Sequence, residues 1–228
     1  MFLSQSVSQC FSDEGALAKA IPGFKARQSQ LDMANAVDSA IKDKKQLVVE
    51  AGTGTGKTFA YLAPALLAGR KVIVSTGTKA LQEQLFHRDL PLIKKALKPK
   101  MKSALLKGRS NYLCLYRLAQ NGQHPPFDDD DFLNDLSHVR RWSSETDSGD
   151  LGELTAIEEG SRVIPFVTST VDNCLGKDCP NIGECHVMNA RKQALDAELV
   201  VVNHHLFFAD MALKDTGFGE LIPEASVI

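Results

Sequence analysis

Residues 50–58 read EAGTGTGKT, in which three glycines alternate with threonines ahead of a Lys-Thr pair. Glycine permits the backbone angles and the close approach that let successive N–H groups converge on phosphate oxygens. A lysine at this position reaches the β- and γ-phosphates of a nucleotide, and the next hydroxyl completes the coordination of Mg²⁺. The stretch therefore predicts a phosphate loop that binds ATP and Mg²⁺, with Lys57 and Thr58 as its catalytic residues.

The loop residues that we expect to contact the nucleotide are Ala51, Gly52, Thr53, Gly54, Thr55, Gly56, Lys57 and Thr58. Ala51 departs from the usual G-x-x-x-x-G-K-[ST] pattern, because it stands where the first glycine belongs. The alternative is a flexible glycine-rich loop followed by an incidental Lys-Thr pair. A phosphate loop joins a strand to a helix, and both are predicted here, which favours the nucleotide site.

Short apolar runs predict buried strands, and apolar residues at helical spacing predict helices. The predicted strands are 46–51, 71–76 and 198–203, with the beginning of another at 225–228. The predicted helices are 27–42, 59–69 (ending at Gly69) and 79–90. Strand and helix alternate and the strands are almost wholly apolar, which predicts an α/β fold built on a parallel sheet.

The region from 108 to 190 interrupts this alternation. It holds four of the five cysteines, a Pro-Pro pair, the acidic run DDDD and the polar loop SSETDSGD. We therefore expect an inserted subdomain there. The predicted division of the chain is an N-terminal segment (1–18), the first part of the α/β domain (19–107), the insert (108–190) and a return to the α/β domain (191–228).

The cysteines of the predicted insert are the candidates for a metal centre. Four residues separate Cys174 from Cys179, five separate Cys179 from Cys185, and Cys114 lies 60 positions before Cys174. The paired C-x-x-C knuckles typical of a zinc ribbon are absent from this set. An iron–sulfur cubane, a structural zinc and unrelated buried cysteines are the three interpretations, and spacing alone leaves cluster and zinc close. Cys10 lies outside every motif and is interpreted as an ordinary free thiol.

Charge is unevenly distributed along the chain, although the net charge is only −2. Between Leu90 and Phe127 there is no acidic residue, while eight lysines and arginines occur there. Such a block can neutralise nucleic-acid phosphates, and a solvated lysine-rich helix and loop is an equally good explanation. No secretory signal and no apolar run of about 20 residues is present, so we expect no membrane partner and a cytoplasmic location.

Four stretches, read together with the cysteines, resemble the XPD/DinG group of superfamily 2 helicases. They are RQSQLDM (27–33), STGTKALQEQL (75–85), KGRSNYLC (107–114) and VVVNHHLF (200–207). The resemblance runs from about Lys19 to Ile228. It implies a RecA-like first motor domain, truncated, with an inserted and mainly helical subdomain. In that group four cysteines hold a [4Fe–4S] cluster, which the resemblance assigns here to Cys114, Cys174, Cys179 and Cys185.

The same resemblance implies roles for two residues upstream of the phosphate loop. Gln30 would hydrogen-bond the adenine edge, with Arg27 beside it. Without the resemblance, both would be interpreted as polar residues on a solvated helix face.

The resemblance also implies contacts with DNA. Thr76 and Thr78 would contact a DNA phosphate, and helix capping is the simpler alternative that can hold at the same time. Lys107 and Arg109 belong to the basic block and are the other DNA-contact candidates. The Asn-His-His sequence at 203–205 is interpreted as polar residues at a strand end rather than as metal ligands.

The function implied is that of an ATP-dependent 5′–3′ helicase on single-stranded or forked DNA, acting in repair or in replication rescue. Replication or repair proteins are the expected partners, in the bacterial cytosol at the nucleoid. The Asp-Glu-x-His motif that such hydrolysis needs does not occur in the 228 residues. We therefore expect this chain alone to hydrolyse no ATP. A non-catalytic nucleotide- and DNA-binding module and a cluster-based redox sensor are the rival functions.

Overall fold

The computed structural model describes residues 6–25, 27–158, 160–215 and 221–228. The chain divides into two compact units, each of which is described by itself. The first comprises Met1–Leu105 together with Asp196–Ile228, and the second comprises Leu106–Leu195. Among the described residues no helix is long and apolar enough to cross a membrane.

The first unit is built around a parallel three-stranded sheet. Its strands are β1 (Val72–Thr76), β2 (Ser103–Leu105) and β3 (Leu199–Asn203), in the order β1-β3-β2. Leu199 pairs with Val72 on one side and with Ser103 on the other. All five residues of the central strand β3 are buried, as expected for a strand covered on both faces. The predicted parallel α/β fold is therefore confirmed.

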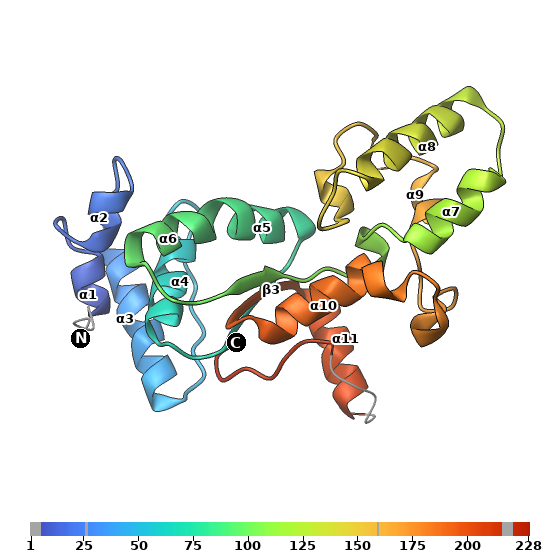
Figure 1. The fold of residues 1–228 in the computed structure, drawn as a ribbon. Coiled ribbons are helices and arrows are strands. Elements are labelled where there is room, and N and C mark those ends of the chain that lie inside the picture. Colours follow the sequence, from blue (N-terminus) through green and yellow to red (C-terminus); the bar gives the residue numbers. More distant parts are fainter. Residues whose placement is uncertain (1–5, 26, 159, 216–220) are drawn as a thin grey trace. The chain divides into compact units, whose positions relative to one another are not determined.

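The helices of the first unit are α1 (Val7–Cys10), α2 (Ala16–Ala20), α3 (Gln28–Asp43), α4 (Lys57–Leu67), α5 (Lys79–Gln84), the π-helical turn η1 (Leu85–Asp89), α6 (Leu90–Leu97) and α11 (His204–Asp215). Some of them lie beside the sheet, and the N-terminal helices α1–α3 lie further from it and pack on α4 and α6 (Figure 1). The predicted helices at 27–42 and 59–69 correspond to α3 and α4. The predicted helix at 79–90 is longer, because α5, η1 and α6 follow one another without a break.

Two apolar clusters hold the first unit together. In one, Leu62 and Leu66 of α4 pack with Val72 of β1 and with Leu199 of β3. In the other, buried residues of α1 and α2 pack against α3 and α4. Since α4 belongs to both clusters, the helix that follows the phosphate loop is fixed on two sides.

The predicted strand at 46–51 is wrong. Leu47, Val48 and Val49 are 43%, 96% and 40% exposed, and residues 45–52 have no regular secondary structure. A strand forms only when a neighbour takes up its N–H and C=O groups, and no described strand lies beside this segment. The outer edge of β1 is instead occupied by Val227, whose carbonyl accepts a hydrogen bond from Ile73 N at 2.9 Å.

The second unit is mainly helical. Its helices are α7 (Leu115–Gln123), α8 (Asp130–Ser143), α9 (Ile164–Val167) and α10 (His186–Asp196), with the short turns η2 (Arg109–Asn111), η3 (Leu151–Glu153), η4 (Gly176–Asp178) and η5 (Ile182–Glu184). Phe132, Leu136 and Val139 of α8 pack with Leu118 of α7 and with Val163. The turns η4 and η5, which alternate with the last three cysteines, lie outside this core.

Candidate functional site

The phosphate loop ends where α4 begins, and two of its three glycines adopt angles that other residues rarely reach. Gly54 and Gly56 have φ values of +73° and +80°, in the left-handed region that side chains rarely enter. Gly56 is the N-cap of α4. A Cβ atom placed on Gly56 would lie 2.2 Å from Nε2 of Gln30. The left-handed backbone at Gly56 therefore favours glycine, and a larger residue there would also displace the Gln30 side chain.

We expect Gly56→Ala to lower the free energy of unfolding by about 1–3 kcal/mol, because left-handed backbone strain and the clash with Gln30 act together. Gly52→Ala is the matched control, since a Cβ there meets no atom within 4 Å. Urea unfolding without nucleotide measures both variants. Equal stability of the two would contradict the preference for glycine at position 56.

Two side chains that precede the phosphate loop in the sequence donate hydrogen bonds to its carbonyls. Nε2 of Gln30 donates to the Gly56 carbonyl at 3.0 Å, and the Arg27 guanidinium donates to the Gly54 carbonyl. Gln30 is 6% exposed, so the interpretation of a solvated helix face is wrong for this residue. The adenine contact predicted for Gln30 and Arg27 stays a prediction. Both residues are placed next to the loop that would hold the phosphates.

The lysine of the loop lies over the loop's own carbonyls. Nζ of Lys57 donates to the carbonyl oxygens of Ala51 at 2.8 Å and Gly52 at 2.7 Å. A bound phosphate would offer this ammonium group charged acceptors in place of neutral ones, which is a stronger interaction. Burial raises the pKa of Tyr61, and Thr58, the predicted Mg²⁺ ligand, acts in the opposite direction on this pKa.

The carboxyl ends of β1 and β3 meet at one edge of the sheet, because the strands are parallel and Thr76 pairs with Asn203. Thr76 is buried, and its hydroxyl donates to the Thr78 carbonyl at 3.2 Å. The Thr78 hydroxyl accepts from Leu81 N and caps α5. The capping alternative is therefore observed, and the DNA contact of these two residues stays a prediction.

His204 joins this edge, which sequence reasoning did not anticipate. Its Nδ1 and the Ser75 hydroxyl are 2.7 Å apart and hydrogen-bonded, although 129 positions separate the two residues. Asn203 accepts a hydrogen bond from Leu206 N at 2.8 Å and so caps α11. The Asn-His-His sequence therefore supplies polar residues at a strand end, as predicted.

Lys107, a predicted DNA contact, faces the interior of the second unit. It is 6% exposed, and its Nζ lies 2.7 Å and 2.6 Å from the two carboxylate oxygens of Asp150. An ammonium group held in this way cannot reach a DNA phosphate without breaking a buried ion pair. The DNA contact of Lys107 stays a prediction, and the sequence does not reveal the partner Asp150, which lies 43 positions downstream.

Arg109, the other candidate from the basic block, contacts a cysteine. Its Nη1 donates to Sγ of Cys174 at 2.7 Å, and the same sulfur accepts from the backbone N–H of Gly176 at 3.4 Å. N–H groups directed at a sulfur stabilise negative charge on it. Arg109 therefore belongs to the surroundings of the cysteines in this structure.

Cys114, Cys174, Cys179 and Cys185 all line one cavity of about 260 Å³ in the second unit. Among the described residues no three His, Cys, Asp or Glu side chains converge closely enough to hold a single metal ion. In a [4Fe–4S] cubane held by four cysteines the thiolates surround a polyatomic group rather than one ion. The four thiols therefore match such a group in residue type, and they line one cavity. Burial raises the pKa of the Cys114 thiol.

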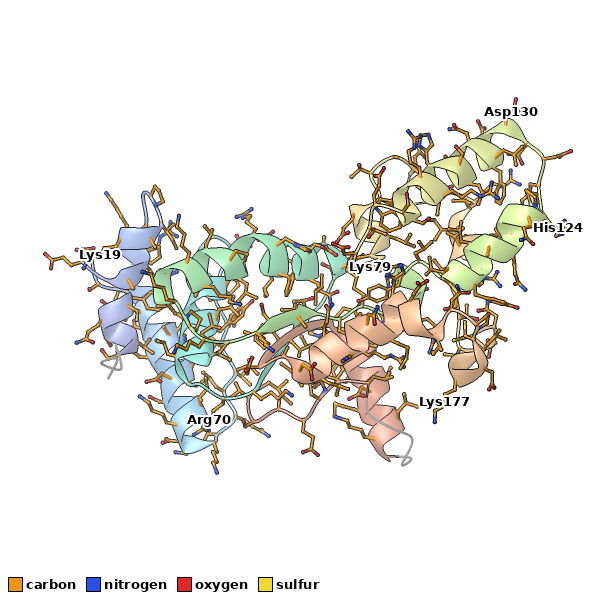
Figure 2. All side chains as sticks on the ribbon, in the orientation of Figure 1. Lys19, Arg70, Lys79, His124, Asp130 and Lys177 are labelled. Carbon is orange, nitrogen blue, oxygen red and sulfur yellow. The ribbon has the colours of Figure 1, made fainter. Side chains whose placement is uncertain are left out.

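The charged side chains that line the cysteine cavity are all cationic. They are Arg109, Lys177 and Arg191, and none of the described residues that line the cavity carries a carboxylate. Lys177 marks the η4 turn in Figure 2. Sequence reasoning missed Arg191, although a signal was present: α10 begins directly after Cys185, so residues three or four apart on it share a face. Val187 and Arg191 line the cavity from that face.

The fold and the loop together define a class: an α/β protein with a parallel sheet and a phosphate loop at the N-terminus of a helix. Residues 31–124 match the family of DEAD/DEAH box helicases. The chain carries a DEAD/DEAH helicase domain and is a homologue of the YoaA and DinG proteins described next.

Three relatives document this homology. The ATP-dependent DNA helicase YoaA of Haemophilus influenzae is 58% identical over 228 residues, which is 100% of this chain and 36% of that protein. YoaA of Escherichia coli is 58% identical over 96% of this chain and 34% of its own length. The ATP-dependent helicase DinG of Mycobacterium tuberculosis is 38% identical over 91% of this chain and 34% of its own length. The chain thus spans about a third of the length of these relatives.

Proposed function

We propose that this chain acts as the first motor domain of an ATP-dependent DNA helicase. The phosphate loop carries this proposal: it joins α4, it contains Lys57 and Thr58, and Arg27 and Gln30 bind its carbonyls. In such an enzyme ATP hydrolysis drives movement along single-stranded DNA. The direction 5′ to 3′, a role in DNA repair or replication rescue, repair or replication proteins as partners and a place in the bacterial cytosol belong to the same proposal.

The organisation proposed for this function follows the predicted division. Residues 1–18 form an N-terminal segment, 19–107 and 191–228 form the RecA-like motor domain, and 108–190 form the insert. The compact second unit, Leu106–Leu195, supports the insert. We further propose that Cys114, Cys174, Cys179 and Cys185 hold a [4Fe–4S] cluster there. The cavity that all four cysteines line supports this assignment, since its described lining residues include no carboxylate.

DNA is proposed to bind at the edge of the sheet where β1 and β3 end. Thr76 and Thr78 would contact a phosphate there through the backbone N–H groups and hydroxyls that open α5. Figure 2 marks this start of α5 at Lys79. A contact between Lys107 and DNA would in addition require its ion pair with Asp150 to open.

A second candidate is a non-catalytic module that binds nucleotide and DNA. The observation that favours it is the absence of an Asp-Glu-x-His motif from the 228 residues. Phosphoryl transfer depends on metal binding, water positioning and cationic stabilisation together. We therefore propose that the chain by itself binds ATP without hydrolysing it, whichever of the two functions holds.

Lys57→Ala tests the nucleotide site. Charge-assisted hydrogen bonds contribute about 1.5–3 kcal/mol, so we expect this variant to bind a fluorescent ATP analogue about 10- to 100-fold more weakly. Lys42→Ala is the control, because Lys42 is a surface lysine paired only with Asp38. If both variants bind equally well, the loop is not the nucleotide site. Hydrolysis by the isolated chain that Lys57→Ala abolishes would contradict the proposed inactivity.

A further inference from the structure

The cysteine cavity contains one arginine for which neither the sequence motifs nor the proposed ligand set provides a role. Arg191 lies on α10, six positions after Cys185, and its side chain is half-buried. It lines the same cavity as Arg109, which belongs to the turn η2 near the start of the second unit. Two segments more than 80 positions apart in the printed sequence thus each place a guanidinium at the same four thiols.

The electrostatic surroundings of Arg191 indicate what it is placed to meet. Burial lowers the pKa of Arg191, the nearby Arg109 lowers it further, and Cys174 and Cys185 act in the opposite direction. Two guanidinium groups brought together in a partly buried place repel each other. Such an arrangement costs free energy unless an anionic group lies between or beside them. Since no carboxylate lines the cavity in the part of the chain that the structure describes, the thiols and the group that they would bind are the anionic partners available there.

We propose that Arg191 is an electrostatic positioning residue for the iron–sulfur group: its positive charge stabilises the reduced, more negative state of that group and so raises its reduction potential. The inference rests on the cluster proposed above. Four thiolates make a cubane site anionic, and adding one electron increases that negative charge. Cluster potentials depend on net charge and on hydrogen bonds to the sulfurs, so a cation in the cavity wall favours the reduced form.

Arg109 and Arg191 act differently in this arrangement. Arg109 donates directly to Sγ of Cys174. No hydrogen bond from Arg191 to a cysteine is described, so its effect is that of a charge at short range. A lysine at position 191 should therefore preserve most of the effect, whereas an uncharged glutamine of similar length should abolish it.

The test compares Arg191→Gln, Arg191→Lys and Lys192→Gln with the unaltered chain, all purified without oxygen. Lys192 is the matched control, because it is the next residue of α10, is exposed and does not line the cavity. Iron and acid-labile sulfide are measured first. A titration with redox mediators, followed by electron paramagnetic resonance of the reduced state, then gives the midpoint potential of the one-electron step.

We expect Arg191→Gln to keep its iron and sulfide and to lower the ratio of reduced to oxidised cluster about tenfold at the midpoint of the unaltered chain. For a one-electron couple this corresponds to a potential about 59 mV lower. Arg191→Lys and Lys192→Gln should both stay close to the unaltered chain. If Arg191→Gln instead fails to assemble a cluster that Arg191→Lys assembles, the charge acts on cluster assembly, and the proposed role in setting the reduction potential is overturned.

Two other results would overturn the inference in distinguishable ways. A cluster present in all four proteins with one common potential would remove the proposed role of Arg191 and leave the proposed cluster standing. Equal loss of the cluster in Arg191→Gln and Arg191→Lys, with the cluster kept in the unaltered chain, would have the same meaning. An unaltered chain without iron and sulfide would remove the proposed cluster itself, and the role of Arg191 with it.

Discussion

Replacing Cys174 with serine is expected to remove essentially all iron and sulfide from protein purified without oxygen. The sulfur of Cys174 is the one that accepts hydrogen bonds from both Arg109 and a backbone N–H, and a hydroxyl is a poor substitute for a thiolate ligand to iron. Because a bound metal group contributes its binding free energy to folding, the second unit should also unfold at lower urea concentration. Metal and sulfide analysis, together with the visible absorption of the cluster, measures the loss.

Cys10→Ala is the matched control for this prediction. Cys10 is completely buried in the first unit and lies outside the cysteine cavity, so its replacement should leave iron and sulfide unchanged. One zinc and no sulfide in the unaltered chain would contradict the cluster and make the insert a structural zinc subdomain. Equal loss of iron in both variants would indicate general instability rather than a ligand.

Lys107→Met is expected to destabilise the second unit by about 3–5 kcal/mol. The substitution leaves the Asp150 carboxylate buried without its cationic partner, and an uncompensated buried charge carries a penalty of that size. Trp142, the only tryptophan of the chain, packs against the core of the second unit. Its fluorescence during urea unfolding therefore reports on this unit selectively.

The combination of Lys107→Met with Asp150→Asn provides the control. Asparagine keeps an oxygen that can accept the hydrogen bond from Gly152 N, and it removes the buried negative charge. We expect the double variant to recover most of the lost stability. Once folded, it should also bind single-stranded DNA as the unaltered chain does. A loss of DNA affinity without a loss of stability would support Lys107 as a DNA contact.

Much of the nucleotide site could be predicted from local sequence. The spacing of the glycines and Lys57 predicts a loop that needs the conformational freedom of glycine, and Gly54 and Gly56 have positive φ in the structure. The helices α3 and α4 and the strand β3 were also predictable, because apolar periodicity along one segment reports which of its faces is buried. These properties depend mainly on residues that lie close together in the sequence.

Pairing between strands was less predictable. The run QLVVEA has the composition of a buried strand, yet it is exposed, because strand formation depends on a partner that its own residues do not specify. The opposite error concerns β2, which is only three residues long, Ser103–Leu105, and lies in a lysine-rich region. It becomes a strand because β3 lies beside it.

The sequence identifies the four cysteines and the charge of each basic residue. It does not show which groups surround these side chains in the fold. Lys107 and Arg109 are two positions apart and look equivalent in the sequence. In the fold one is paired with Asp150 and the other with Cys174, which lie 43 and 65 positions away. Only the folded chain brings Arg191 to the same cavity, and it places the carboxylates of the described residues outside the cavity lining. The reason is physical: residue type determines which chemistry is available, whereas burial and distance, which long-range packing sets, determine which charge meets which partner.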